Sequence, residues 1–246
     1  MFTKKEESYI EYTGRRIPFH IIYELRRSVR VAFGTKAITL RIPWVMTSEN
    51  KLKHIERSKK WAVDQLKVKP GLISNFVARQ YIDGQILLIG DKKYILHIQY
   101  SDRKTNRASM KGQLLEVHLS TDITDEQKPE ILRYLISRTI ANSAYPEIAQ
   151  RVHELNDLHF KKQIKDIKLK LSQTNWGSCS TQGNINLSAR LLFAPQPVID
   201  YVIIHELSHL IEHNHSDRFW TIVEKVMPEY EKYEKWLKVN SHLCEF

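Results

Sequence analysis

The chain has 246 residues, of which 42% are hydrophobic and 27% are charged, and its formal net charge is +10. This composition is typical of a folded protein of one or two domains, and it excludes the disordered and fibrous classes. The longer apolar runs, such as 86–89 and 198–204, fall far short of the roughly 20 residues that a membrane-spanning helix needs. Two cysteines are too few for a disulfide framework, and the first residues lack an apolar signal-peptide core. We therefore expect a cytoplasmic protein without a membrane partner.

The first half of the chain has the pattern of a β-rich domain. Short apolar or alternating runs predict strands at Phe19–Tyr23, Val29–Phe33, Ala37–Ile42, Gln85–Ile89, Tyr94–Gln99 and Leu115–Leu119. Helical spacing of apolar residues predicts one helix over Glu49–Leu66, with Ser48 as its N-cap. The polar stretch Ser101–Gly112 shows no periodicity and predicts a loop. We place the domain boundary after residue 120, which gives a basic N-terminal domain over 1–120 and a C-terminal domain over 121–246.

The second half is predicted to begin with helices and to end with them. One helix starts near Asp125, and a second is expected from Pro146 to about Leu158. Alternation predicts strands at Ile167–Leu171 and Asn184–Ser188, joined through a turn. The later helices are expected over Ile199–Glu212, from Ser216 and from Pro228. Together, the two halves predict an α+β fold.

The segment from His205 to His209 reads His-Glu-Leu-Ser-His on a predicted apolar helix. Residues four apart project from the same face of a helix, so the two imidazoles can ligate one tetrahedral zinc ion. Glu206 stands beside the first histidine, where its carboxylate can take a proton from the attacking water. The motif predicts a zinc-dependent hydrolase with Glu206 as general base. The alternative is a pair of structural histidines in a buried helix.

A catalytic zinc site needs a third protein ligand and leaves one position to water. The downstream candidates are Glu212, His213 and His215. We favour His215, because Asn214 tolerates the left-handed backbone that ends helices and the chain can turn back there. Its spacing from His209 is that of the extended metzincin pattern, although Glu212 occupies the position of the glycine in that pattern.

Positive charge is concentrated in the N-terminal half. Residues 1–110 carry 22 Lys+Arg against 10 Asp+Glu, whereas residues 111–246 carry 16 against 18. Such asymmetry is typical of a surface that binds nucleic acid or nucleotides, and it also occurs as an ordinary solvated basic face. The sequence thus predicts a polyanion as a candidate partner of residues 1–120.

Taken together, the motifs of the second half resemble the YgjP-like metallopeptidase family. The resemblance rests on Thr174–Ser180, Gly183–Leu187, Ala194-Pro195, Ile199–Leu210, Asn214–Ser216 and Phe219-Trp220, and it extends to Tyr23–Ser28 and the Gly90–Tyr94 hairpin. It implies a zincin domain, related to SprT-like and minimal gluzincin proteases, preceded by a small β-rich domain. It also implies His205, His209 and His215 as zinc ligands and Glu206 as the base. Asn175 stands where the resemblance implies arginine, a departure that concerns substrate contacts near that strand.

Three functions fit these observations. The first is a zinc-dependent metallopeptidase that acts on a peptide or protein. The second is a phosphohydrolase for nucleotides, dependent on zinc or another divalent metal, because such an ion can activate water for attack on phosphorus as well as on carbon. The third is a nucleic-acid-associated SprT-like protein, as the basic N-terminal half would suit.

Overall fold

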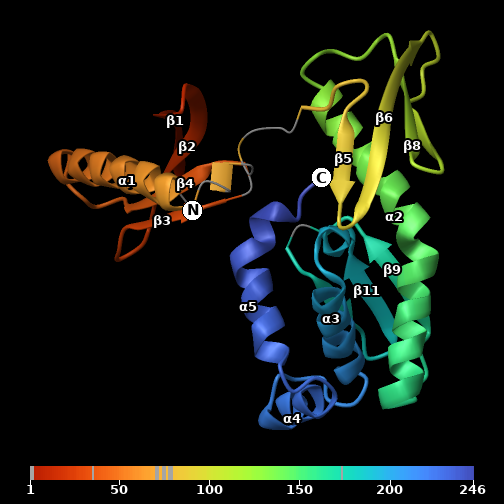
Figure 1. Ribbon diagram of the computed structural model, residues 1–246. Coiled ribbons are helices and arrows are strands. Elements are labelled where there is room, and N and C mark those ends of the chain that lie inside the picture. The colour runs from red at the N-terminus through yellow and green to blue at the C-terminus, as the bar shows by residue number, and fades with distance from the viewer. Residues whose placement is uncertain (1–2, 35, 70–71, 74–75, 77–79, 173) are drawn as a thin grey trace. The chain divides into compact units, whose positions relative to one another are not determined.

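Figure 1 shows the computed structural model, which describes residues 3–34, 36–69, 72–73, 76, 80–172 and 174–246. The chain divides into two compact units, Met1–Arg79 and Gln80–Phe246, which we call the N-terminal unit and the C-terminal unit. Helices and strands are mixed in both units, which confirms the predicted α+β class. Among the described residues, no helix has the length and apolar character needed to cross a membrane.

The N-terminal unit is a four-stranded sheet with one helix packed on one of its faces. Its elements are β1 (Lys4–Tyr12), β2 (Arg15–Glu24), β3 (Arg30–Phe33), β4 (Ile38–Pro43) and α1 (Ser48–Val68). The strand order is β1-β2-β4-β3, and neighbouring strands are antiparallel except for β2 and β4. Alternation along β2 places Ile17, Phe19 and Ile21 on the covered face, where Ala62 and Leu66 of α1 complete the core.

The C-terminal unit contains two sheets and the remaining helices. Its strands are β5 (Ile86–Ile89), β6 (Lys92–Ser101), β7 (Arg107–Lys111), β8 (Leu114–Ser120), β9 (Asp166–Lys170), β10 (Gly177–Cys179) and β11 (Asn184–Ser188). Its α-helices are α2 (Lys128–Leu155), α3 (Gln196–Ser208), α4 (Asp217–Val226) and α5 (Tyr230–Asn240), with shorter helical turns at Asn156–Phe160, Ala189–Phe193 and Ser241–Leu243. One sheet has the order β5-β6-β8-β7, and the other has the order β10-β11-β9.

Helix α2 contributes to the cores of both sheets of this unit. Its first half places Leu132 and Ile136 among the buried side chains of strands β5 to β8, and its second half places Ile148 in the core around β11 and α3. A domain boundary after residue 120 would separate the sheet of strands β5 to β8 from α2, the helix that covers it. The two compact units divide between residues 79 and 80, whereas the sequence predicted a boundary after residue 120.

Pro146 lies inside α2 and does not begin a new helix there, so the predicted break is wrong. A proline in a helix leaves the carbonyl four residues earlier without its hydrogen bond. Both Pro146 and Asn142 are exposed, so water can satisfy that carbonyl. On the opposite side, Ala144 and Ile148 remain buried, and their packing holds the helix together across the proline.

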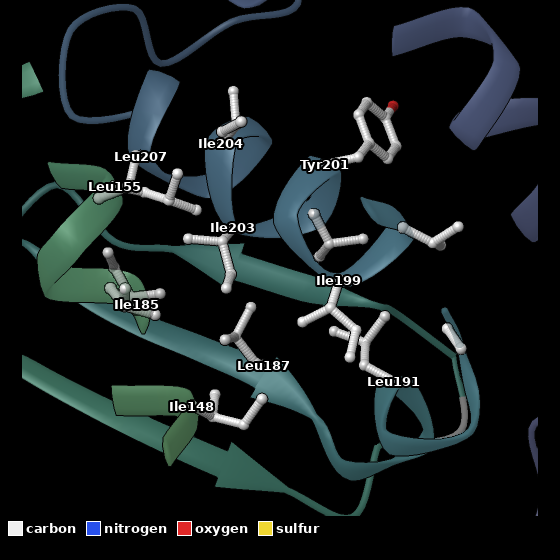
Figure 2. Packing of buried hydrophobic residues seen from close by; sticks show 14 of the residues in the cluster. Ile148, Leu155, Ile185, Leu187, Leu191, Ile199, Tyr201, Ile203, Ile204 and Leu207 are labelled. Atoms are coloured by element: carbon white, nitrogen blue, oxygen red, sulfur yellow. The ribbon is translucent and has the colours of Figure 1, made fainter. Parts of the chain in front are cut away.

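Helix α3 is apolar on nearly all sides because it lies in the centre of the C-terminal core. Ile199 and Ile203 point toward β11, where Ile185 and Leu187 lie (Figure 2), and Leu207 belongs to the same buried cluster. Ile203 and Leu207 are fully buried. A helix surrounded in this way is held rigidly, which suits an element that carries functional side chains at its end.

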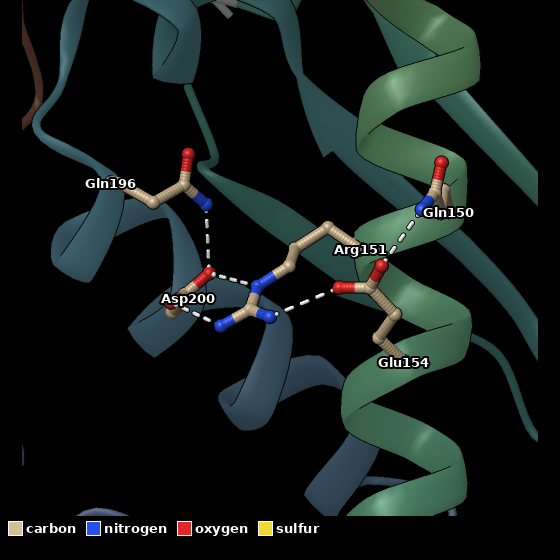
Figure 3. Close-up of polar contacts among 5 residues, drawn as sticks. All are labelled: Gln150, Arg151, Glu154, Gln196 and Asp200. Carbon is tan, nitrogen blue, oxygen red and sulfur yellow. Dashed lines mark hydrogen bonds and ion pairs between the residues drawn. The ribbon is translucent and has the colours of Figure 1, made fainter.

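Arg151 of α2 binds Asp200 of α3 and so links the two helices. Its Nε and Nη2 donate to the two carboxylate oxygens of Asp200 on α3, at 2.9 and 2.8 Å, and its Nη1 donates to Glu154 at 3.0 Å (Figure 3). Gln196 donates to the same Asp200 carboxylate at 2.8 Å. Because the Arg151–Asp200 contact is bidentate, it fixes orientation as well as distance between the two helices.

Three strands, β1, β7 and the short β10, were not predicted, and β7 lies within the segment predicted as a loop. Each of the three stands at an edge of its sheet. Edge strands commonly carry polar side chains on both faces, which weakens the hydrophobic alternation on which the prediction depends.

Candidate metal centre

The His-Glu-Leu-Ser-His segment forms the end of α3. The helix ends at Ser208, four residues earlier than predicted, and His209 is its C-cap residue. The Ser208 hydroxyl donates to the carbonyl of Ile204 at 2.8 Å, which satisfies this buried side chain within the helix. The chain then turns before α4 begins at Asp217, and this turn carries His215 back toward the end of α3.

Three histidines converge at this turn. One ligand nitrogen from each of His205, His209 and His215 lies within 4.8 Å of the others, and this group contains neither Glu212 nor His213 among the described residues. The Nε2 atoms of His205 and His215 are 3.0 Å apart. The side chain of Glu212 instead faces Arg218, at 3.7 Å. Of the candidates for a third metal ligand, the fold thus brings His215 to the other two.

The charge state and orientation of these imidazoles suit a metal ion. Burial, followed by the neighbouring His209 and His215, lowers the pKa of His205 to about 4, so the ring is neutral at pH 7. Burial also lowers the pKa of His209. The Nδ1 of His209 lies 3.1 Å from the carbonyl oxygen of Glu212, an arrangement that leaves its Nε2 free to ligate. Three imidazole nitrogens that converge in this way, two of them 3.0 Å apart, fit a divalent transition metal.

The histidines rest on one buried aromatic ring. Phe219 of α4 is completely buried, and its ring centroid lies 4.9, 4.5 and 4.8 Å from those of His205, His209 and His215. On the outer side, Trp220 stacks on His215 at 5.8 Å. Helix α4 therefore supplies a support that touches all three imidazoles. The sequence motif identified Phe219 and Trp220 but not this contact with the complete histidine group.

Glu206 follows His205 in the chain, and its side chain is buried. Its exposed fraction is 4%, and its Oε2 has no hydrogen-bond partner among the described atoms. Burial raises its pKa to about 8. A divalent cation close by would favour the ionised carboxylate, so this arrangement suits a carboxylate that acts next to a metal.

Strand β10 borders the Glu206 carboxylate. A Cβ atom built at Gly177 would lie within 2.7 Å of both Cγ and Cδ of Glu206, so only glycine leaves the space that this side chain occupies. Cys179, two residues along the strand, is half-buried, and burial raises the pKa of its thiol to about 11. The sequence singled out the motif that contains Gly177 without showing that this glycine faces the candidate base.

Arg190, which the sequence did not indicate as a site residue, contacts Trp176, the residue before β10. The guanidinium of Arg190 lies 4.5 Å from the ring centroid of Trp176. The same side chain donates to the carbonyls of Cys244 and Ser241, both at 2.8 Å. Arg190 thus links the start of β10 to the C-terminal segment. Asn175, by contrast, is exposed, and its backbone N–H donates to the Ser172 hydroxyl at 3.4 Å.

The chain is similar to one protein family and to a curated protein. A family model described as "YgjP-like, metallopeptidase domain" matches residues 26–240. A curated relative, the UTP pyrophosphatase of Escherichia coli (strain K12), is 25% identical over 79 residues, which are 32% of this chain and 47% of the relative. The match thus spans about half of that relative's length.

Two crystal structures of metallopeptidase zymogens are also similar. Abylysin of Pyrococcus abyssi is 23% identical with a TM-score of 0.35, and the alignment covers 40% of this chain and 96% of abylysin. Jannalysin of Methanocaldococcus jannaschii is 24% identical with a TM-score of 0.32, covering 39% of this chain and 96% of jannalysin.

Proposed function

Because the chain belongs to the YgjP-like metallopeptidase family, as its sequence motifs indicated, we propose that it is a zinc-dependent metallopeptidase. In this proposal His205, His209 and His215 hold the metal and Glu206 is the general base. The observation that carries it is the convergence of three imidazole nitrogens beside a buried carboxylate.

Zinc is the metal that best suits the donor set. Three neutral imidazoles that leave one position open are typical of catalytic zinc sites. When bound, zinc would polarise a substrate oxygen and lower the pKa of a coordinated water to about 7. The ring of His209 is oriented by the Glu212 carbonyl, and those of all three histidines by Phe219, so the chain holds its nitrogens in place before the metal arrives.

The role proposed for Glu206 is proton transfer. Its carboxylate would accept a proton from the attacking water and then deliver it to the leaving amine. Its 4% exposure keeps bulk water from competing for that proton. Gly177 leaves room for the carboxylate, and the walls of α3 and β10 restrict its rotamers.

A peptide substrate is supported by the free edge of β10. The carbonyl of Trp176 accepts from the amide of Ser188, and the amide of Ser180 donates to the carbonyl of Asn184. Because main-chain groups alternate in direction along an antiparallel strand, those of Gly177 and Cys179 point away from β11. An extended peptide could add to this edge, with its backbone running past Glu206.

A second candidate is hydrolysis of a nucleotide phosphate, which the name of the Escherichia coli relative favours. The same carboxylate and histidines could serve this reaction, because attack on phosphorus also needs a deprotonated water. The two candidates differ in the bond that is cleaved and in how the substrate is held.

The distinguishing experiment is a substrate panel on the purified protein reconstituted with zinc. Unfolded proteins and quenched fluorescent peptides test peptide hydrolysis, and nucleoside triphosphates test release of phosphate or pyrophosphate. We expect peptide cleavage that is lost on chelation and restored by zinc. Metal-dependent cleavage of nucleotides alone would favour the second candidate over the metallopeptidase.

We also propose a reducing, cytoplasmic location, which the free thiols of Cys179 and Cys244 support.

A further inference from the structure

The positive charge of the chain belongs to one structural unit. Residues 1–79 carry 17 Lys+Arg against 7 Asp+Glu, a net charge of +10, whereas residues 80–246 carry 21 against 21. The unit that contains the histidine group is thus formally neutral. A small unit with this excess attracts polyanions, and the surface that would bind one must be sought on the N-terminal sheet and helix.

The sheet of the N-terminal unit has one face that α1 does not cover. The covered face carries the apolar core with Phe19 and Leu40. Alternation turns the intervening residues to the opposite face, which we call the open face. The cationic and aromatic residues on this face include Lys5, Tyr9, Arg16, His20, Arg30 and Arg41.

Strand register aligns three of these cations in one row. Lys5 lies opposite Ile22, Ile22 opposite Arg41, and Arg41 opposite Arg30. Neighbouring strands are about 4.8 Å apart, so the row crosses the sheet over about 14 Å. Lys5, Arg41 and Arg30 are all exposed. This geometry sets positive groups along a line on which a phosphate backbone could lie.

Acidic neighbours neutralise this row only in part. Glu24 accepts from both Arg41 and Arg26, at 2.8 and 2.9 Å, so one carboxylate serves two guanidinium groups. Glu7 pairs with Lys5 at 2.9 Å. For Arg30 the described residues include no carboxylate within ion-pair distance. Lys5, Arg26, Arg30 and Arg41 thus have only two carboxylate partners among them, Glu7 and Glu24, and a positive excess remains.

The open face also carries a planar stack. The ring of Tyr9 is 45% exposed, and the guanidinium of Arg16 lies 4.4 Å from its centroid. Tyr9 lies opposite Pro18 on β2, on the same face as the cationic row. A phenol and a guanidinium that are both planar and accessible are the groups on which unpaired bases stack in single-stranded nucleic acids.

We propose that the open face of the N-terminal sheet binds single-stranded nucleic acid. Lys5, Arg30 and Arg41 contact phosphates, and the Tyr9–Arg16 stack receives a base. A duplex fits this surface less well, because its bases are stacked inside and cannot reach Tyr9. The inference goes beyond the hydrolytic function and does not depend on the metal.

The test measures fluorescence anisotropy of the full-length protein with a labelled single strand of about 16 nucleotides, which is the upper end of the site sizes found for single OB folds. The affinity should fall linearly with salt on logarithmic axes, starting from about 50 mM. Arg30→Gln/Arg41→Gln should reduce the magnitude of that slope by about 1.4, because each phosphate contact of a single strand contributes about 0.7. The matched control is Arg103→Gln/Arg107→Gln, two exposed arginines of the C-terminal unit, which should change neither the slope nor the affinity.

The stacking step has its own pair of variants. Tyr9→Ala should weaken binding about 5- to 150-fold, and Tyr9→Phe should retain it, because the ring and not the hydroxyl stacks. Thermal unfolding confirms that each variant is folded. Absence of binding at about 50 mM salt would overturn the proposal. So would an equal change of affinity and salt slope in Arg30→Gln/Arg41→Gln and in Arg103→Gln/Arg107→Gln. Tighter binding of a duplex than of a single strand would also overturn it. Unchanged affinity of Tyr9→Ala would overturn it as well.

Discussion

Gly177 on β10 lies directly against the carboxylate of Glu206 at the end of α3, with no room for a Cβ atom between them. We predict that Gly177→Ala displaces this carboxylate while the histidine group stays intact. A displacement of about 1 Å can cost about 100-fold in rate, so kcat/KM should fall by that order with zinc content unchanged.

Ser178→Ala is the matched control for this variant. Its side chain lies on the other face of β10, where the Ser178 hydroxyl accepts from Asn186 at 3.1 Å. We expect kcat/KM within about threefold of wild type, since loss of one exposed hydrogen bond is worth about 0.5 kcal/mol. Equal losses in Gly177→Ala and Ser178→Ala would mean that the strand as a whole is sensitive and that the Gly177–Glu206 contact is not special.

The ligand assignment predicts which histidines are needed for zinc. Single substitutions His205→Ala, His209→Ala and His215→Ala should each remove most of the metal, as measured by mass spectrometry of dialysed protein. His213→Ala is the control, because His213 is a neighbour in sequence but lies outside the converging group. Retention of zinc by His215→Ala together with its loss from His213→Ala would show that the third ligand is wrongly assigned.

Metal removal should also lower the stability of the native state. A ligand present at about 1,000 times its Kd stabilises the fold by about 4 kcal/mol, so chelation should reduce Tm and added zinc should restore it. The same treatment should leave the Tm of His205→Ala unchanged. A wild-type Tm that does not respond to chelation in zinc-loaded protein would contradict a site of this strength.

The contact of Phe219 with all three imidazoles predicts a role in positioning them. Phe219→Leu should weaken zinc binding about tenfold, measured by competition with a chelator, because leucine keeps much of the volume but loses the flat ring. Val223→Ala is the control: Val223 is fully buried one turn further along α4. It should lower stability by about 1–3 kcal/mol without a comparable effect on zinc affinity. If the zinc affinity of Phe219→Leu falls no more than that of Val223→Ala, Phe219 contributes only to core packing and does not position the imidazoles.

The Arg151–Asp200 pair predicts a measurable link between α2 and α3. Asp200 is 13% exposed in its side chain and Arg151 36%, and their contact is bidentate. A double-mutant cycle with Arg151→Ala and Asp200→Ala should give a coupling energy of about 1–2 kcal/mol. The exposed Lys92–Glu147 pair, with side chains 52% and 67% exposed, should give less than about 0.5 kcal/mol in a parallel cycle. Equal coupling in the two cycles would argue against a special role for Arg151.

The convergence of the three histidines could be predicted from the sequence, but the side chains that surround them could not. His205 and His209 followed from helical periodicity, and His215 followed from a turn that brings the chain back. Such inferences depend only on local geometry. The support from Phe219 and the space left by Gly177 involve segments distant from the motif, and spacing along the chain carries no information about those contacts.

The fold shows the same division between local and distant information. Strands with clear alternation were predicted, whereas the edge strands β1 and β7 were missed because both carry mainly polar side chains. The predicted boundary after residue 120 followed a change from strands to helices. It could not show that Leu132 and Ile136 of α2 cover the strands that precede them.

The most direct test of the proposed chemistry is Glu206→Gln. Glutamine has nearly the shape of glutamate but cannot accept the proton of the attacking water. Burial raises the pKa of Glu206 to about 8, so this position already disfavours charge, and a neutral amide should keep the fold and the zinc. Removal of a general base commonly costs about 10²–10⁴-fold in rate. We expect a loss of that size in kcat, with unchanged zinc content and Tm.

This variant separates the mechanism from the identity of the substrate. Cleavage of a peptide and cleavage of a nucleotide phosphate would both use the same carboxylate, so the loss should appear on whichever substrate the wild type accepts. His213→Ala serves as the control for a polar substitution near the site that spares both the base and the converging histidines. Because Glu206→Gln retains the metal in our prediction, its inactivity cannot be attributed to an empty site. Near-normal turnover by zinc-loaded Glu206→Gln would rule out Glu206 as the base and leave the three histidines with at most a structural metal.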